Sequence, residues 1–417
     1  MATRQFVTGM TLALVLNATH AVWAEESVEL DFTDDAKETT LHTEEIDRFE
    51  QRIATIESMG GAFDSGLSEE LLGLGLALQR SGRHERAVQV LKRGTHVTRI
   101  NEGLFTKSQI PFLKAEVVSL GELGELGDLA EADERYDYLI KVQEESLTAG
   151  PERVKAWNEF AQWQKSLFLS NPREENFYRL AKMLTVYEKS LADLVEYEEE
   201  YNLIKTSLSG LLQTYFLITS FDEGEDISPF ERRSAFDEDQ IQSNFYEYYR
   251  QADRGAPSVI ELLVRTESKV HGPVSFEAFH ASLQLADWNL WRGQRRAAFE
   301  VYQQIDQVIG ELEDEARIKE LRTRLFGEPV LLPDLDTIRL LPPAVPKEDG
   351  NVRLSFTVTD RGSVRRVERV EVAEGLDGAT GRFIRMLRKA TFRPKIVDGQ
   401  TVTLQDIEQS YVLPEAK

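Results

Sequence analysis

The stretch LLGLGLALQRSGRHERAVQVLKRG, residues 71–94, decides how most of this chain folds. Apolar residues recur every three or four positions on both sides of Ser81-Gly82, which is the pattern of two amphipathic helices joined by a tight turn. Gly75 and Ala87 are small, so the two helices can cross closely there while larger apolar residues fill the space around them. The stretch therefore predicts a helical hairpin.

Two further stretches repeat the spacing of this hairpin. The register resembles the tetratricopeptide repeat, a helix-turn-helix unit of roughly 34 residues. Because Ala87 and Ala132 are further apart than one such unit, we expect a degenerate array, a right-handed solenoid whose concave surface holds peptides or partner proteins. A generic helical bundle with similar hairpins is the alternative. The three copies carry Leu71, Leu74, Gly75, Leu78, Gly82, Ala87, Leu91 and Gly94; Leu120, Leu123, Gly127, Ala132, Tyr136 and Leu139; and Leu285, Ala286, Gly293, Ala298, Tyr302 and Ile305.

Changes of pattern divide the chain into segments. Residues 25–45 are polar and acidic and predict a flexible leader. Helical periodicity then extends over residues 46–326, whereas residues 327–348 hold five prolines and predict a semi-rigid linker. Alternation with a period of two begins in the last segment, residues 349–417. Breaks within the helical region are expected at Gly150-Pro151, Asn171-Pro172, Ser228-Pro229, Ala256-Pro257 and Gly272-Pro273.

Residues 1–24 have the pattern of an export signal. A single charge at Arg4 precedes an apolar stretch, and Val22-Trp23-Ala24 places a small residue at the cleavage position. We expect cleavage after Ala24, a location in the periplasm of a Gram-negative cell, and no stable membrane span in the mature chain. Retention of the segment as a membrane anchor is the alternative.

Composition argues against several classes of function. The 417 residues are 41% apolar and 29% charged, enough to bury a large core, and the absence of Cys rules out disulfides and thiolate metal sites. A formal net charge of -23 disfavours binding to nucleic acid. The six His are too dispersed for a metal site, and no motif singles out a nucleophile or a pair of catalytic carboxylates. We therefore expect no metal, no cofactor and no enzymatic activity.

The C-terminal residues alternate as half-buried strands do. Residues 352–358 alternate between apolar and polar, and a tight turn leads into a second strand over residues 364–372. Asp377 is expected to cap an amphipathic helix, and further strands are expected over residues 401–404 and 407–413. The order strand, strand, helix, strand predicts a small α+β domain. The fold class is thus multidomain, an all-α helical-repeat solenoid followed by this domain.

Several motifs in residues 349–417 together resemble the C-terminal domain of the TonB energy transducer family. The resemblance implies a periplasmic domain whose sheet edge receives an extended segment of an outer-membrane transporter, by β-augmentation. It implies the last strand as the docking edge; a covered or self-paired edge is the alternative. The motifs are Gly350-x-Val352-x-Leu354-x-Phe356-x-Val358, Gly362 followed by Val364, Phe392-x-Pro394 with Gly399, and Tyr411-Val412-Leu413, and the candidate docking residues are Ile407, Gln409, Tyr411, Val412 and Leu413.

Charge is distributed unevenly between the segments. The last segment has a net charge of +2, so the rest of the chain carries -25. We expect the basic residues of the last segment to form a face that docks on the acidic helical region of the same chain. The candidate residues are Arg365, Arg366, Arg369, Arg382, Arg385, Arg388 and Lys389.

Together these features predict a periplasmic adaptor without enzymatic activity. The helical scaffold would hold one partner and the sheet edge another, with envelope proteins or peptides, including an outer-membrane receptor, as partners. The alternative is an anchored energy transducer. Several features of the sequence depart from that family. The N-terminus has a cleavable pattern, Leu16 stands where the family has a serine four residues before His20, the linker is short, and a helical-repeat region fills the middle of the chain.

Overall fold

The computed structural model describes residues 33–124, 129–171, 176–220, 238–335 and 341–414. The expected export signal lies outside these residues, as does the expected break at Ser228-Pro229. The chain forms two compact units, Met1–Asn176 and Phe177–Lys417.

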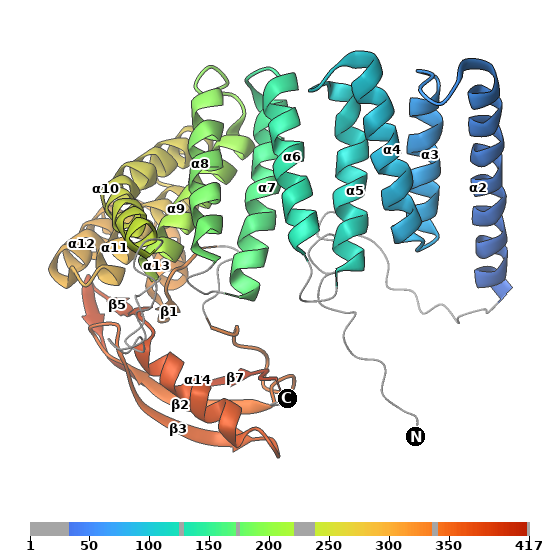
Figure 1. The fold of residues 1–417 in the computed structure, drawn as a ribbon. Helices are drawn as coiled ribbons and strands as arrows, with labels where there is room; N and C mark the ends of the chain where they lie inside the picture. The colour runs from blue at the N-terminus through green and yellow to red at the C-terminus, as the bar shows by residue number, and fades with distance from the viewer. Residues whose placement is uncertain (1–32, 125–128, 172–175, 221–237, 336–340, 415–417) are drawn as a thin grey trace. The chain divides into compact units, whose positions relative to one another are not determined.

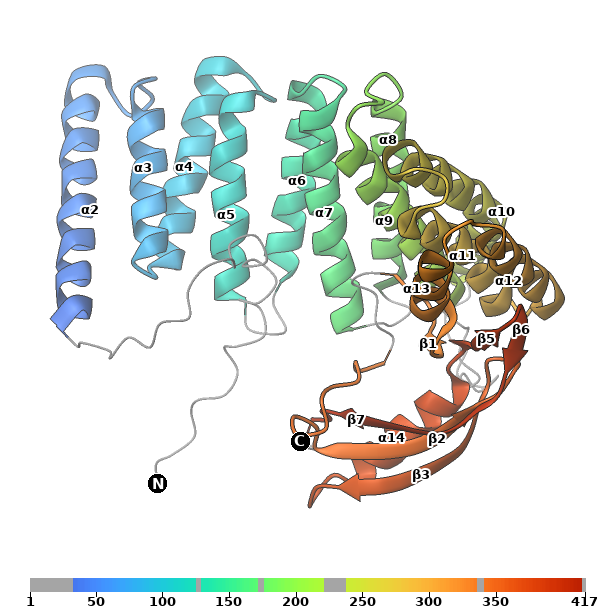
Figure 2. The same ribbon diagram turned by 180° about the vertical axis from the view of Figure 1, so that it is seen from behind.

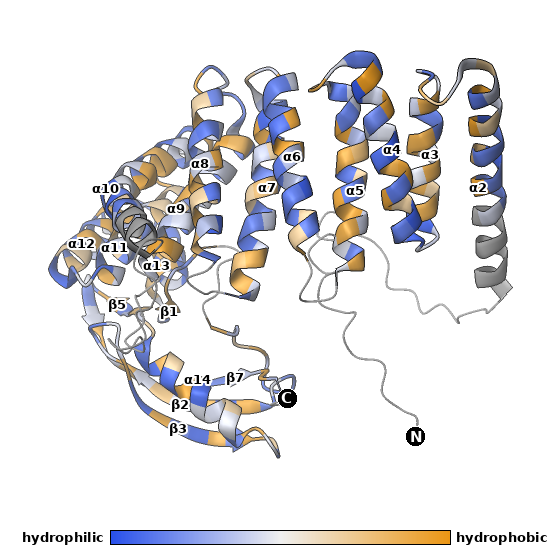
Figure 3. Ribbon diagram, viewed as in Figure 1, coloured by the Kyte–Doolittle hydropathy of each residue, from blue (hydrophilic) through white to orange (hydrophobic). Residues whose placement is uncertain are grey.

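The described part of the first unit is helical. Successive helices lie side by side and are joined by short connections, so that each helix packs on its neighbours in sequence (Figure 1). Bands of apolar and polar residues alternate along these helices in Figure 3, as expected for helices that bury one face. The helices are α2 (Thr33–Gly60), α3 (Leu67–Arg80), α4 (His84–Glu102), α5 (Ile110–Leu123), α6 (Ala130–Ser146) and α7 (Pro151–Ser170), with a short 3₁₀ helix at Lys107–Gln109.

The predicted hairpin is confirmed by α3 and α4. Gly82 has φ = 71° in the turn between them, a backbone conformation that favours glycine. Gly75 on α3 packs against the Leu91 side chain on α4, and a methyl group at Gly75 would overlap it. Ala87, Ala132 and Ala298, which share one position in the three copies, are each 0% exposed. The small residues therefore stand where the helices approach most closely.

The start of α2 differs from the expected flexible leader. Residues 33–45 belong to this helix. The sequence contains no Pro or Gly between Thr33 and Met59 that would end a helix, and Ile46 and Ile53 anchor α2 in the core it shares with α3. A helix fixed at its C-terminal half can thus extend backwards through polar residues.

The second unit begins with further helices. The third copy of the repeat is confirmed as the hairpin of α11 and α12, with Gly293 at φ = 74° in its turn. The expected break at Ala256-Pro257 is wrong, because Pro257 lies inside α10. Ala252, Ala256 and Ile260 form a buried face that continues past the proline, and this packing maintains the helix. The helices are α8 (Phe177–Asp193), α9 (Tyr201–Ser220), α10 (Glu238–His271), α11 (Phe276–Trp291), α12 (Arg295–Gly310) and α13 (Glu315–Phe326).

The rest of the second unit is an α+β module. Its main sheet has the strand order β3-β2-β7 with antiparallel pairing, and α14 covers one face of this sheet (Figure 2). Phe356, Phe383, Leu387 and Tyr411 are buried between helix and sheet. The elements are β2 (Val352–Val358), β3 (Val364–Val372), α14 (Asp377–Lys389), β4 (Phe392–Arg393), β5 (Lys395–Val397), β6 (Gln400–Val402) and β7 (Leu404–Tyr411).

Two details of this segment differ from expectation. Asp377 is the first residue of α14 and not its cap; its carboxylate accepts a hydrogen bond from Arg369 at 2.7 Å. Residues 327–335 of the expected semi-rigid linker pack on the rest of the unit, because β1 (Val330–Leu331) pairs with β4 and Leu332 is buried among α11, α12 and α13. The apolar run between Glu328 and Pro333 explains this difference, since Leu332 is buried and Leu331 is partly buried against the core of the module.

One carboxylate of the first unit is buried among three helices. Glu116 on α5 is 0% exposed, and its Oε2 lies 2.7 Å from Arg135 Nη2 on α6. Lys92 Nζ on α4 lies 4.0 Å from Oε1. Burial raises the pKa of Glu116 above its ordinary value of 4.5, and the two positive charges offset only part of this effect.

The close contacts between helices lead to a matched pair of glycine substitutions. A methyl group at Gly94 on α4 would overlap the buried Phe112 ring, whereas one at Gly121 on α5 would lie 3.9 Å from Trp163, an ordinary contact. Gly94→Ala is expected to reduce the free energy of unfolding by about 1–3 kcal/mol. Gly121→Ala is expected to leave it unchanged or raise it by up to about 1 kcal/mol. Urea unfolding measures both; equal losses would contradict the predicted close approach.

The buried carboxylate predicts a pH dependence of stability. Because the folded-state pKa of Glu116 is raised, its contribution to stability is present at low pH and is lost as pH rises through that pKa. Glu116→Gln keeps an acceptor for Arg135 and removes the ionisation. The variant should therefore gain stability relative to the native chain as pH increases from 4 to 8, measured by thermal unfolding. The exposed Glu122→Gln is the control, and a parallel gain in both variants would exclude Glu116 as the cause.

Candidate protein-interaction surfaces

The last strand forms one edge of the main sheet, and its residues divide into two sets. Ile407, Gln409 and Tyr411 lie opposite Phe356, Leu354 and Val352 of β2. The carbonyl of Ser410 instead accepts a hydrogen bond from the Val345 amide at 2.8 Å, so this residue turns its backbone away from β2. Because backbone groups alternate along an antiparallel strand, Glu408 also presents its amide and carbonyl outward.

The candidate docking residues thus have different environments. Tyr411 is 4% exposed and packs against Phe383 with ring centroids 4.6 Å apart, and Leu413 is 5% exposed. The backbone of Leu413 is already bonded to the Asn351 side chain, at 2.8 Å for both hydrogen bonds. Val412 is 52% exposed. The backbone groups that point away from β2 belong instead to Glu408 and Ser410, and neither residue is among the candidate docking residues.

The opposite edge of the sheet is formed by β3, which is irregular. Its register with β2 shifts at two points, and Arg366 has φ = 49°. Exposed charged residues of both signs occupy most of its length. Bulges and charges of this kind protect an edge strand against pairing with another chain. The β7 edge also has one register shift, near Asp406 with φ = 53°, but it keeps a single register with β2 from Ile407 to Tyr411. That part of β7 is the better template for an added strand.

The seven residues of the expected basic face are all exposed. Arg369 pairs with Asp377 of the same module at 2.7 Å. Among the residues described in the second unit, none of the seven forms an ion pair with helices α8 to α13. Within this unit, the expected docking of the basic face on acidic helices is therefore not what holds the module.

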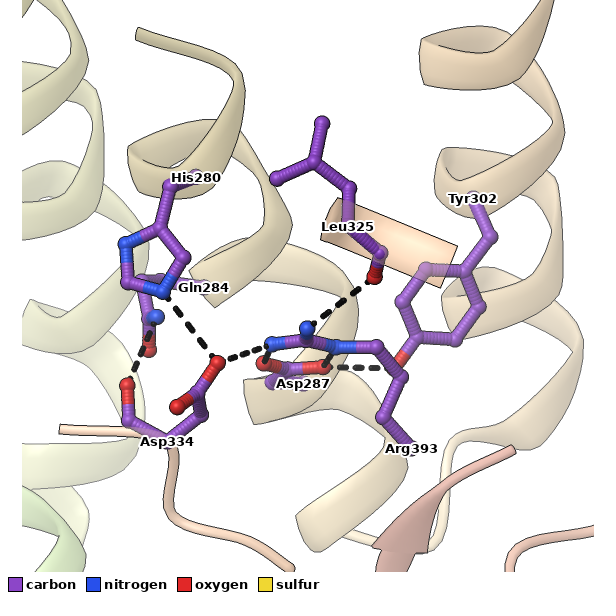
Figure 4. A network of polar contacts seen from close by, with 7 residues as sticks. All are labelled: His280, Gln284, Asp287, Tyr302, Leu325, Asp334 and Arg393. Carbon is purple, nitrogen blue, oxygen red and sulfur yellow. Dashed lines mark hydrogen bonds and ion pairs between the residues drawn. The ribbon is translucent and has the colours of Figure 1, made fainter. Parts of the chain in front are cut away.

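The module is held to the helices by another basic residue, Arg393 on β4. This side chain is 1% exposed and lies against α11 and α13 (Figure 4). Its Nε and Nη2 donate to the two carboxylate oxygens of Asp287 at 3.0 and 2.5 Å. Nη2 also donates to Asp334 at 2.7 Å, and Nη1 donates to the Leu325 carbonyl at 3.3 Å. One guanidinium thus joins β4, α11, α13 and the segment after β1.

Further side chains complete the polar network around Arg393. Tyr302 on α12 donates to Asp287 at 2.6 Å, and His280 Nε2 lies 3.2 Å from Asp334 Oδ2. Burial alone would raise the pKa of Asp334, but the hydrogen bond from His280 and the charge of Arg393 outweigh it and lower the pKa to about 2. Burial would likewise lower the pKa of Arg393, yet Asp287 and Asp334 raise it. Asp334 and Arg393 are thus both stabilised as ions.

The sequence contains a signal for this network in two isolated charged residues. Asp287 stands in an otherwise apolar part of α11, between Ala286 and Trp288, and Arg393 stands between Phe392 and Pro394. A charged residue in an apolar run is costly to bury unless it is paired. Asp287 and Arg393 have opposite charges and are therefore candidates for pairing with each other. They are far apart in the sequence, so the sequence alone does not predict that they come into contact.

None of the described helices combines the length and the apolar character that a membrane crossing requires. Nor do three or more His, Asp or Glu side chains of the described residues gather where they could hold a metal ion.

Comparison with known proteins gives limited similarity. No family model matches the chain, and no curated protein matches it. A solved kinesin light chain of Podosopora anserina with nearly identical TPR-like repeats has 14% identity and a TM-score of 0.34, over 61% of this chain and 95% of its own. A single-residue variant of that protein has 15% identity and a TM-score of 0.34, over 61% and 94%.

The network predicts a large cost for loss of Arg393. Arg393→Met leaves Asp287 buried without its partner, so the free energy of unfolding of this unit should fall by about 3–5 kcal/mol. Arg369→Met removes a surface pair and should cost less than about 1 kcal/mol. Hydrogen exchange in β4 and α11, followed against urea concentration, measures both. Similar protection in the two variants would show that Arg393 does not hold the module.

Proposed function

We propose that the protein is a periplasmic adaptor that binds an extended segment of a partner protein along β7. The observation that carries the proposal is the outward backbone of Glu408 and Ser410 on the regular part of this strand, which pairs with β2 without a register shift from Ile407 to Tyr411. A strand added here gains main-chain hydrogen bonds, and its side chains contact alternate positions of the edge.

The chain itself occupies one position of this edge. Val345 bonds to Ser410 as a single bridge, and the neighbouring Lys347 and Glu348 are exposed. A partner strand would replace this bridge and extend past it to Glu408. Because one backbone hydrogen bond contributes only about 0.5–1.5 kcal/mol net, its loss is small compared with a new ladder of several bonds. The bridge selects for partners long enough to pair with both residues.

The helical region provides the second part of the proposal. Its hairpins bury their small residues and leave the polar faces of each helix in solvent, as scaffolds for protein partners do. The N-terminal pattern supports export and cleavage after Ala24, and the motifs shared with the TonB family support envelope proteins, including an outer-membrane receptor, as partners. The function proposed is binding and not catalysis.

The outward geometry of Glu408 allows a test with two variants at one position. Glu408→Pro removes an amide that would pair with the partner, while the ladder from β7 to β2 keeps its bonds. Glu408→Ala removes only the side chain. Synthetic peptides with the periplasmic N-terminal segments of the host's outer-membrane transporters are titrated by fluorescence anisotropy. We expect at least tenfold weaker binding to the Pro variant and less than a twofold change for the Ala variant.

Two outcomes would contradict the proposal. Equal binding by the native chain and the Pro variant would place the peptide elsewhere, and no binding of any transporter segment would remove the receptor as a partner. The protein for this titration is taken from the osmotic-shock fluid of its host, and its intact mass is measured. A chain that retains Met1 and stays with the membrane would contradict the periplasmic location.

A further inference from the structure

A shallow groove lies where α12 meets the turn between β2 and β3, apart from the β7 edge. Its volume is about 460 Å3, and its walls combine charged and apolar groups. The lining residues are Arg295, Arg296, Phe299, Glu300, Gln303 and Arg361. Neither the expected basic face nor the expected docking strand includes any of them.

The groove has an excess of positive charge. The acidic residue among the lining residues is Glu300, and its carboxylate pairs with Arg296 at 2.9 Å. Arg295 and Arg361 form no ion pair with any described residue of the chain. Asp306, one turn beyond Gln303, is already bound to Arg322 at 2.7 and 3.1 Å. Two guanidinium groups therefore remain available to an anionic partner.

The two sides of the groove are held in place by the fold. The turn that carries Arg361 is fixed, because Gly362 accepts a hydrogen bond from the Phe392 amide at 2.9 Å and the Asp360 amide donates to Thr403 at 3.0 Å. Arg295 begins α12, whose buried Ala298 and Tyr302 anchor it in the core. Only the long arginine side chains must become ordered when a ligand binds.

The occupant follows from this combination of groups. The half-buried Phe299 offers an apolar contact, and guanidinium groups bind carboxylates with paired hydrogen bonds. The chain's net charge of -23 repels polyanions such as nucleic acids, whereas a short acidic segment meets the local positive charge. We propose that this groove binds an acidic peptide segment of a partner protein, with carboxylates on Arg295 and Arg361 and an apolar side chain on Phe299.

The proposal is tested with a defined probe and two double variants of equal charge change. The probe is a fluorescein-labelled peptide in which Glu and Asp flank a central Phe, and an amide version with Gln and Asn is the control peptide. The full-length exported chain should bind the acidic peptide, with affinity that falls as NaCl increases. Arg295→Gln with Arg361→Gln should weaken binding at least fivefold. Arg382→Gln with Arg388→Gln, on α14, should change it less than twofold.

Each of the following outcomes would overturn the proposal. A larger loss in the α14 double variant would assign binding to the basic face, and equal losses in both would indicate nonspecific attraction. Equal binding of the amide peptide would exclude carboxylate recognition. Inorganic phosphate, added to the complex with the labelled peptide, should displace the peptide only weakly. Displacement at a phosphate concentration equal to that of the peptide would identify a small-anion site instead. Absence of binding by the native chain at 50 mM NaCl would also reject the groove as a peptide site.

Discussion

The buried ion pair between Arg393 and Asp287 determines how the second unit is assembled. A guanidinium that is 1% exposed cannot remain without a partner, because the cost of burying an isolated charge exceeds the stability of most domains. Bidentate bonding to Asp287 and a further bond to Asp334 satisfy it. The geometry of two parallel hydrogen bonds is directional, so the α+β module has a defined position on α11 and α13.

The interaction surfaces of the second unit follow from this arrangement. In the main sheet of the module held there, β2 is central and β7 and β3 are the edges. The irregular, charged β3 is protected, whereas β7 keeps one register with β2 from Ile407 to Tyr411. The turn between β2 and β3 is brought to α12, where Arg361 joins Arg295 in one groove. The seven residues of the basic face are exposed, and among the described residues of this unit they form no ion pair with helices α8 to α13.

Features that depend on local sequence could be predicted well. The hairpin of residues 71–94 follows from apolar periodicity and from Gly82 at a positive φ, and both are local properties. Predictions that treated a local signal as decisive were wrong where packing opposed it: Pro257 lies within α10, and the acidic residues 33–45 extend α2. In α10, buried apolar residues lie on both sides of the proline and hold the helix together. In α2, the buried residues that follow the acidic stretch fix the helix, and the stretch continues it.

The candidate sites were predictable only in part. The pattern of alternation identified the last strand but not which of its backbone groups face outward, because that depends on pairing with β2 and on the bridge from Val345. The sequence by itself determined the helical hairpins, the α+β order of the last segment and the distribution of charge. Only the tertiary structure decided that Arg393 meets the helices of the second unit, since residues 106 positions apart become partners through packing.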